Sequence, residues 1–420
     1  MTSEPPLDWL LNKHAASCAG SDSVAGLMPA GIAREARAFH RQIPDFKQSP
    51  LKGLTRLAGM LGLGGLWVKD EAVRLSLNSF KVLGGSFAIY RYLLQRLGVE
   101  GRSVSFAELT SSETKAKLGA ITFAAATDGN HGRGVAWAAS KLGQRSVIYV
   151  HEKTSPARIN AIKCYGADVR IVKGTYDDAV RQAGADAEAN GWQVISDTSW
   201  EGYEEIPTWI MQGYTTLYAE AQEQLTGQGI TKPTHLFVQA GVGALAASGI
   251  AFYHALFGAE APTCVVVEPS KAACLLASAR QGDGWPQHFG GDLDTIMAGL
   301  ACGDPSPVAW DLLWSCADAF VACPDYVAAK AMRVYSVPLE GDPIVISGES
   351  GAVTLGALMY IMEHEAGASL REQLGLTAES QVLLVNSEGN TDPEYFRRIV
   401  WEGADAVPEE YRHRVVEEGS

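Results

Sequence analysis

Residues 121–150 read ITFAAATDGNHGRGVAWAASKLGQRSVIYV, and this stretch decides the class of fold. It begins with a β-rich run at 121–127, continues with a helix-like run at 135–143 and ends with a second β-rich run at 145–150. A strand, a helix and a strand in this order are typical of a βαβ unit, whose two strands lie parallel in one sheet.

The same alternation continues towards the C-terminus. Further β-rich runs lie at 167–172, 192–196, 234–239, 263–268, 319–323 and 381–386, and helix-like runs lie at 155–166, at 175–190 and after Pro207. The sequence therefore predicts an α/β fold with mostly parallel sheets flanked by helices. Because 420 residues exceed the size at which a single core stops growing, we expect two lobes.

The amino-acid composition argues against two kinds of ligand, nucleic acids and metal ions. The net charge of −14 and the pI near 5.1 argue against a nucleic acid. Seven cysteines occur without a CxxC pair and without histidines at metal-ligand spacing, so we expect reduced cytoplasmic thiols and no metal site.

No targeting or membrane segment is expected. The N-terminal MTSEPPLDWL lacks a basic region followed by a long apolar stretch, and the apolar run at 241–258 is interrupted by glycines and by His254.

Four loops rich in glycine and small polar residues follow predicted strands: 127–132, 196–203, 240–245 and 387–390. In open α/β sheets, ligands bind beyond the carboxyl ends of the strands, so these loops are where a site is expected. The loop GVGAL at 241–245 opens a helix, and its backbone N–H groups could hold a phosphate; a simple packing turn is the alternative. Position 246 is alanine, which does not match the dinucleotide-binding pattern and disfavours a nicotinamide cofactor.

Lys81 lies in the segment NSFKVLGG at 78–85, after the strand-like run 66–71. A lysine at the start of a helix is usually exposed to solvent. Here Phe80, Val82 and Leu83 flank it, so partial burial could lower the pKa of the amine and make it a nucleophile towards an aldehyde.

These motifs together resemble the fold-type II pyridoxal-phosphate (PLP) enzymes, which include threonine dehydratases, threonine synthases and tryptophan synthase β-subunits. SFK followed by Gly-Gly, then TDGNHGRGVA, GVGAL and NSEGN, occur in that order across most of the chain. Within that group, the segments 78–85, 126–139, 197–214 and 386–392 resemble the diaminopropionate ammonia-lyase family.

The resemblance implies PLP in a cleft between a large lobe at 1–90 and 204–420 and a smaller lobe at 91–203. Lys81 would hold the cofactor as a Schiff base, and Asn130 would contact its ring hydroxyl. Ser387 would be a neutral partner of the pyridine nitrogen, with Asn386 and Glu388 as open alternatives; a neutral partner makes the ring a weaker electron sink. The phosphate would bind at Gly241, Val242, Gly243, Ala244 and Leu245.

Asp128 departs from the dehydratases of this group, which usually have serines before GNHG. A carboxylate there would repel a substrate carboxylate and attract an ammonium, which fits a second amine on Cβ. Asp197, at another strand end, could pair with Asp128 around that ammonium, and two close carboxylates would raise the pKa of one. Helix capping is the alternative for Asp128, and a role in loop structure for Asp197.

Several other polar and aromatic residues are expected to shape the site without taking part in the reaction. His131 is expected to form a wall of the cofactor site. The residues Ser350, Gly351 and Ala352 are expected to form a tight turn near the cofactor. Trp200, Tyr203, Trp209 and Tyr214 are expected to pack the wall and the core.

The predicted function is α,β-elimination of ammonia from 2,3-diaminopropionate, in both D and L forms, giving pyruvate. Lys81 and Asp128 are the candidate bases, one on each face. A serine or threonine dehydratase, or a β-replacement synthase, is the alternative, and a PLP-binding protein without turnover is a third hypothesis. The resemblance also implies a homodimer with a small amino-acid substrate, and we expect a cytoplasmic enzyme of amino-acid catabolism.

Overall fold

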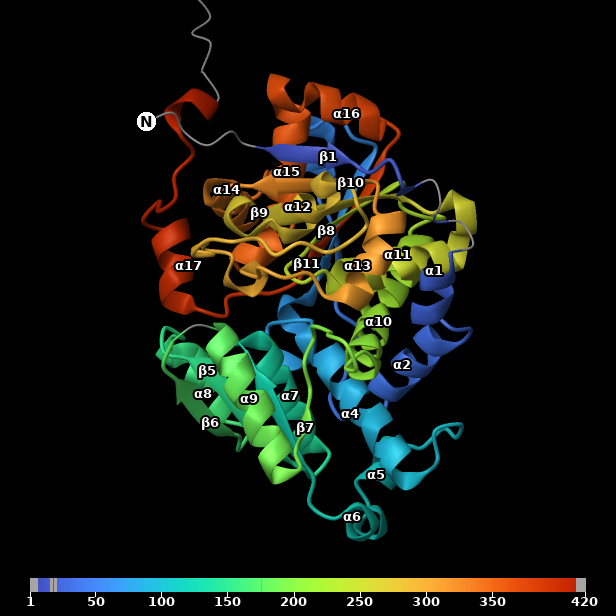
Figure 1. Ribbon diagram of the computed structural model, residues 1–420. Coiled ribbons are helices and arrows are strands. Elements are labelled where there is room, and N and C mark those ends of the chain that lie inside the picture. The colour runs from blue at the N-terminus through green and yellow to red at the C-terminus, as the bar shows by residue number, and fades with distance from the viewer. Residues whose placement is uncertain (1–6, 16–17, 19–20, 128, 175, 413–420) are drawn as a thin grey trace, which may run out of the picture.

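The computed structural model describes residues 7–15, 18, 21–127, 129–174 and 176–412. Within these residues the strands form two separate sheets, and helices pack around both of them (Figure 1). The predicted α/β fold with mostly parallel sheets is confirmed.

The larger sheet has seven strands among the described residues, in the order β1-β10-β9-β8-β11-β3-β2. They are β1 (Asp8–Leu11), β2 (Leu51–Gly53), β3 (Gly65–Asp70), β8 (His235–Gln239), β9 (Thr263–Pro269), β10 (Ala319–Cys323) and β11 (Gln381–Asn386). The central strands are parallel, whereas the short edge strands β1 and β2 pair antiparallel. The central strands coincide with predicted runs, and the two edge strands were not predicted.

The smaller sheet is wholly parallel in the order β6-β5-β4-β7. Its strands are β4 (Thr122–Ala126), β5 (Arg145–His151), β6 (Asp168–Val172) and β7 (Gln193–Val194). Helix α7 (Asn130–Lys141) connects β4 to β5, so the stretch 121–150 forms the predicted βαβ unit. The helix begins at Asn130, as the helix-capping alternative for Asp128 assumes, so the GNHG motif lies at its first turn, ahead of the helix-like run at 135–143.

Helices surround each sheet. Helices α7, α8 (Pro156–Lys163) and α9 (Tyr176–Asn190) pack on the smaller sheet, whereas α5 (Phe106–Leu109) and α6 (Ser112–Leu118) contact each other ahead of β4 in the chain. The others are α1 (Asp22–Leu27), α2 (Ile32–His40), α3 (Thr55–Met60), α4 (Lys81–Leu97), α10 (Glu205–Gly227), α11 (Ala244–Phe257), α12 (Cys274–Gln281), α13 (Pro307–Cys316), α14 (Asp325–Ser336), α15 (Glu349–Glu363), α16 (Ala368–Leu374) and α17 (Pro393–Val400).

The two faces of the larger sheet contribute to different core clusters. In β8, Leu236 and Val238 belong to the cluster that includes α10 and α11, whereas Phe237 belongs to the cluster that includes α14 and α15. Side chains that alternate along a strand point to opposite faces, so a continuous apolar run is what a sheet covered on both sides requires.

Close packing of α4 against α10 positions the helix that begins at Lys81. A Cβ at Gly84 would lie 2.4 Å from Tyr214 Cε1, and one at Gly213 would lie 2.5 Å from the Leu83 carbonyl oxygen. Only glycine permits this approach of the two helices. Pro207 lies in the first turn of α10, where its missing N–H costs no helical hydrogen bond.

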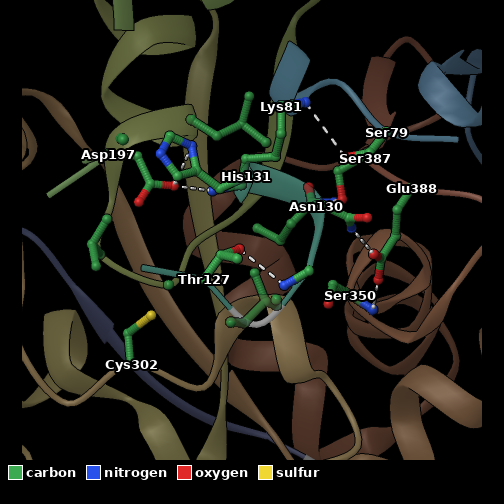
Figure 2. Close-up of a pocket in the computed structure, with 18 of the residues that line it drawn as sticks. Ser79, Lys81, Thr127, Asn130, His131, Asp197, Cys302, Ser350, Ser387 and Glu388 are labelled. Atoms are coloured by element: carbon green, nitrogen blue, oxygen red, sulfur yellow. Dashed lines mark hydrogen bonds and ion pairs between the residues drawn. The ribbon is translucent and has the colours of Figure 1, made fainter. Parts of the chain in front are cut away.

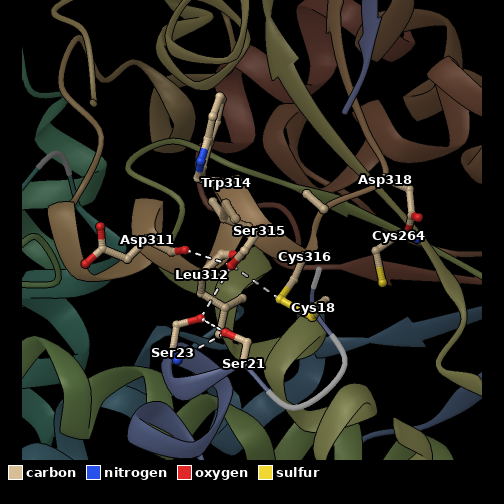
Figure 3. Close-up of a disulfide and its surroundings, with 12 residues drawn as sticks. Cys18, Ser21, Ser23, Cys264, Asp311, Leu312, Trp314, Ser315, Cys316 and Asp318 are labelled. Carbon is tan, nitrogen blue, oxygen red and sulfur yellow. Dashed lines mark hydrogen bonds between the residues drawn. A yellow bond between two sulfur atoms is a disulfide. The ribbon is translucent and has the colours of Figure 1, made fainter. Parts of the chain in front are cut away.

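Two cysteines do not follow the expectation of reduced thiols. Cys18 and Cys316 form a disulfide that links the segment before α1 to the end of α13 (Figure 3). Their Cα atoms lie 4.7 Å apart although 298 positions separate them in sequence, so the spacing of the cysteines did not reveal the pair. The other five cysteines form no disulfide within the described residues.

The helices were compared with the length and apolar character of a membrane span. Among the described residues, none of them combines the length and the apolar character that a membrane span needs.

Candidate active site

One cavity collects residues from all four of the loops singled out in the sequence. Its empty volume is about 900 Å³ when the open solvent at its mouth is included, and its walls come from the carboxyl ends of β4, β8 and β11 together with the start of α4. The predicted residues that line it are Lys81, Asn130, Asp197, Gly241, Val242, Gly243, Ala244, Leu245 and Ser387. Asp128 lies outside the described residues, but its neighbours Thr127 and Gly129 both line the cavity.

Lys81 is held in place by the chain on either side of the cavity. The Phe80 N–H donates to the Ser387 carbonyl oxygen at 3.1 Å, and the Gly389 N–H donates to the Asn78 carbonyl oxygen at 2.9 Å. The left-handed φ of +57° at Asn78 belongs to the turn that enters α4. The lysine side chain then extends into the cavity and forms an ion pair with Asp197 (Figure 2).

The charge state of Lys81 differs from the sequence-based expectation. Burial by itself acts to lower the pKa of Lys81, but the Asp197 carboxylate outweighs it and raises that pKa well above the usual range. The same pairing, against the effect of burial, holds the pKa of Asp197 well below that of an ordinary carboxyl. In this arrangement Lys81 is an ammonium and Asp197 is a carboxylate.

His131 approaches the same carboxylate oxygen of Asp197 that Lys81 contacts. Its Nε2 is 2.8 Å from the Ile195 carbonyl oxygen, which can only accept a hydrogen bond, so Nε2 carries a proton. Nδ1 faces Asp197 Oδ2 at 3.8 Å (Figure 2). The buried ring lines the cavity, as expected of a wall residue.

The glycine loop lies between β8 and α11, with Gly243 at the N-cap of the helix and a φ of +99°. A Cβ at Gly243 would lie 2.8 Å from Leu313 Cδ1, and one at Gly241 would lie 3.0 Å from Cys302 Sγ. The loop therefore packs closely against the protein on one side and opens into the cavity on the other. The first N–H groups of α11 have no partner within the helix, which suits them to bind a phosphate.

Asn130, Ser387 and Glu388 also line the cavity. Asn130 Nδ2 donates to Glu388 Oε2 at 2.6 Å, and the Ser350 N–H donates to Glu388 Oε1 at 3.2 Å. An amide nitrogen has two hydrogens, so Asn130 keeps one for a ligand. Ser387 Oγ accepts from Gln239 Nε2 at 2.6 Å.

The alternatives to Ser387 are engaged elsewhere. Asn386 Nδ2 donates to Asp70 Oδ1 at 2.8 Å, and Asn386 Oδ1 accepts from the Ser347 hydroxyl at 2.8 Å. Asn386 is not among the residues that line the cavity, and the side chain of Glu388 is occupied by Asn130 and the Ser350 N–H.

Some structural expectations need correction. The four aromatic residues do not line the cavity: Tyr214 packs on Phe80 with ring centres 4.7 Å apart, and Tyr203 stacks on Trp200 at 4.1 Å. Tyr214 and Trp209 are buried, as expected of packing residues, whereas Trp200 is 42% exposed, so the expectation fails for Trp200. Residues 350–352 form the first turn of α15 rather than a tight turn, although Ser350 does line the cavity.

The sequence did not single out Gln239, Cys302 or Arg158, which also line the cavity. Gln239 could have been found, because it ends a predicted strand directly before the glycine loop. Cys302 and Arg158 carry no comparable local signal.

The polar groups of the cavity match those of PLP. A helix-opening glycine loop suits the phosphate, Lys81 suits the aldehyde, the free amide hydrogen of Asn130 suits the ring hydroxyl, and Ser387 suits the ring nitrogen. All of these groups line one cavity.

Comparisons with known proteins agree with this match. The family model described as "Pyridoxal-phosphate dependent enzyme" matches residues 44–388. Diaminopropionate ammonia-lyase of Salmonella typhimurium is 44% identical over 92% of this chain and 96% of its own length, and that of Escherichia coli K12 is 45% identical over 89% and 92%. The crystal structure of the holo E. coli enzyme superposes with a TM-score of 0.88 at 42% identity, covering 96% of this chain and 98% of that one.

The chain is thus a PLP-dependent enzyme of fold type II. More specifically, it belongs to the diaminopropionate ammonia-lyase family and is a carbon–nitrogen lyase.

Proposed function

We propose that this protein eliminates ammonia from 2,3-diaminopropionate. The observation that supports this substrate best is the contact between Asp197 and Lys81. Asp197 is a cavity carboxylate that binds a primary ammonium in the structure. Once Lys81 is joined to the cofactor it no longer offers that ammonium, and the ammonium on Cβ of the substrate can take its place beside the carboxylate.

The net reaction consumes one water. The Cα–H and Cβ–N bonds break, ammonia leaves from Cβ, and the resulting 2-aminoacrylate takes up water to give pyruvate and a second ammonia. A relative from E. coli has been crystallised with an aminoacrylate-PLP azomethine intermediate, which agrees with this course for that protein.

Four groups of lining residues would hold the cofactor, which would supply an electron sink for the carbanion at Cα. Lys81 holds it covalently, residues 241–245 bind its phosphate, Asn130 binds the ring hydroxyl, and the Ser387 hydroxyl binds the ring nitrogen. A neutral hydroxyl leaves the ring a modest electron sink, which suits prompt loss of the β-amine.

Two bases allow both enantiomers to react. Lys81, once the α-amine of the substrate has displaced it from the cofactor, would take up the Cα proton from one face, and Asp128, two positions after the end of β4 in the sequence, would take it up from the other. The D and L forms present this hydrogen to opposite faces, so we propose that both are substrates.

At the level of the whole protein, the proposal includes a homodimer located in the cytoplasm. It also includes a division into a large lobe at 1–90 and 204–420 and a smaller lobe at 91–203. Size-exclusion chromatography with light scattering measures the oligomeric state directly.

The function is tested by incubating purified protein and PLP with racemic 2,3-diaminopropionate and following pyruvate. Equal concentrations of serine and threonine serve as comparison substrates, and 2-oxo acid formation is measured with each. Faster turnover of diaminopropionate is the expected result. Preference for serine or threonine would identify a dehydratase, and no turnover of any of the three would contradict the proposal.

A further inference from the structure

Gln239 is a buried amide at the ring-nitrogen end of the cavity. It is the last residue of β8, it is 1% exposed, and it lines the cavity directly before the glycine loop. Its Nε2 lies 3.1 Å from the Val385 carbonyl oxygen and 2.6 Å from Ser387 Oγ.

The Val385 carbonyl fixes the orientation of this amide. A carbonyl oxygen can only accept, so the group that faces it must be the NH₂ end of the glutamine. The reversed amide would place two oxygen acceptors 3.1 Å apart inside the protein. The second N–H of Gln239 therefore points to Ser387 Oγ, and this contact makes Ser387 the acceptor.

Ser387 then has one hydroxyl hydrogen left to donate. Among the described residues, no acceptor for it is found, and the side chain lines the cavity. The backbone at Ser387 is also anchored, because its carbonyl oxygen accepts from the Phe80 N–H at 3.1 Å.

Neighbouring carboxylates are occupied with other partners. Glu388 accepts from Asn130 Nδ2 and from the Ser350 N–H. Asp70 accepts from Asn386 Nδ2 and pairs with Lys52 at 2.7 Å. Within the described part of the chain, the hydroxyl of Ser387 is therefore not drawn towards a charged acceptor.

We propose that Gln239 is a positioning residue that makes Ser387 donate its hydroxyl hydrogen into the cavity, so that the ring nitrogen of the cofactor accepts it and stays unprotonated. The proposal rests on the proposed function, in which Ser387 binds that nitrogen. It assigns control of the ring's protonation state to a residue that does not touch the reacting atoms.

The test uses the holoenzyme reconstituted with PLP labelled with ¹⁵N in the ring, and nitrogen NMR as the readout. The wild type is expected to show an unprotonated ring nitrogen. Gln239→Glu keeps the shape but turns the donor into an acceptor, so Ser387 donates to it instead. This should shift the ring-nitrogen signal upfield, into the protonated range.

Gln239→Met removes the donor without adding charge and should shift the signal in the same direction by a smaller amount. It also keeps the proposal testable if Gln239→Glu does not fold. Gln222→Glu is the matched control: Gln222 is a buried glutamine that likewise donates to a hydroxyl, on Thr226, and to a carbonyl, on Thr231, but it does not line the cavity. This variant should leave the nitrogen signal unchanged.

The outcomes separate this proposal from the one on which it rests. A wild-type protein that binds no PLP would contradict the proposed function itself. A protonated ring nitrogen in the wild type would overturn the role of Ser387 and, with it, that of Gln239. An unprotonated nitrogen that stays so in both Gln239 variants would overturn the role of Gln239 alone.

Discussion

Lys81 and Asp197 each determine the charge of the other within the cavity. Removal of Lys81 deprives a buried carboxylate of its counter-ion, and the pKa of Asp197 should then rise from its depressed value. The carboxyl can take up a proton, so the fold has a way to accommodate the loss.

We therefore expect Lys81→Ala to give a folded protein without the visible absorbance of lysine-bound PLP. Treatment with borohydride followed by mass spectrometry should find no reduced cofactor adduct. Lys141→Ala, at an exposed position of α7, should keep both the absorbance and the adduct. A borohydride-reducible adduct in Lys81→Ala would show that another lysine holds the cofactor.

Asp128 can be tested through stereochemistry. If it is the base on the face opposite Lys81, Asp128→Asn keeps the shape of the side chain and removes the proton acceptor. Loss of a general base costs roughly 10²–10⁴-fold in rate, and this loss should fall mainly on D-diaminopropionate.

Pyruvate formation from each separate enantiomer measures the effect, with Asp168→Asn, an exposed residue of β6, as the control. Equal losses for both enantiomers would make Asp128 a substrate-binding group. Unchanged rates for both enantiomers would leave helix capping as the role of Asp128.

At the scale of elements, the junction of β8 and α11 depends on one backbone conformation. Gly243 has a left-handed φ of +99°, and a Cβ there would meet Leu313 Cδ1 at 2.8 Å. The side chain added by Gly243→Ala would therefore point into the protein and force the loop to move. Strain of about 1–3 kcal/mol is expected for a non-glycine residue in such a region.

Gly243→Ala should weaken PLP binding by roughly tenfold or more, because each 1.4 kcal/mol corresponds to about a factor of ten. The larger Gly243→Val should weaken it further. Gly258, at the other end of α11, has a φ of +59°, and an added Cβ would meet no atom within 4 Å, so Gly258→Ala imposes backbone strain away from the loop. If titration gave equal PLP affinity for Gly243→Ala and Gly258→Ala, the loop would be only a packing turn and not a phosphate-binding loop.

The elements that the sequence predicted are those with a strong local pattern. Central strands such as β9 are continuous apolar runs, because both of their faces are buried. The edge strands β1 and β2 are too short to carry a pattern, and they were missed.

The predictability of the site follows the same rule. The four loops and Lys81 were found because glycine-rich motifs mark strand ends. The pairing of Lys81 with Asp197, and of Gln239 with Ser387, depends on contacts across 116 and 148 positions. Local sequence patterns do not specify such contacts, so the raised pKa of Lys81 was not foreseen.

At the scale of the whole molecule, the disulfide between Cys18 and Cys316 joins the segment before α1 to the end of α13 (Figure 3). A cross-link over 298 positions restricts the unfolded chain, and native disulfides typically contribute about 2–4 kcal/mol of stability. Both sulfurs are buried, and neither cysteine lines the cavity. The bond should therefore affect stability and leave catalysis unchanged.

Treatment with a phosphine reductant should lower the melting temperature of the oxidised protein by roughly 2–5 °C, given the unfolding entropy of a chain of this size. Cys18→Ser and Cys316→Ser should each melt at the temperature of the reduced protein, and the reductant should not lower that temperature further. Cys164→Ser is the control, at an exposed free cysteine, and should respond to the reductant as the wild type does. Pyruvate formation should be the same in both redox states, because neither cysteine lines the cavity. A melting temperature that does not respond to the reductant, in protein whose bond is verified by mass spectrometry, would show that the cross-link adds no stability. A loss of activity on reduction would show instead that the link between α13 and the N-terminal segment supports the active site.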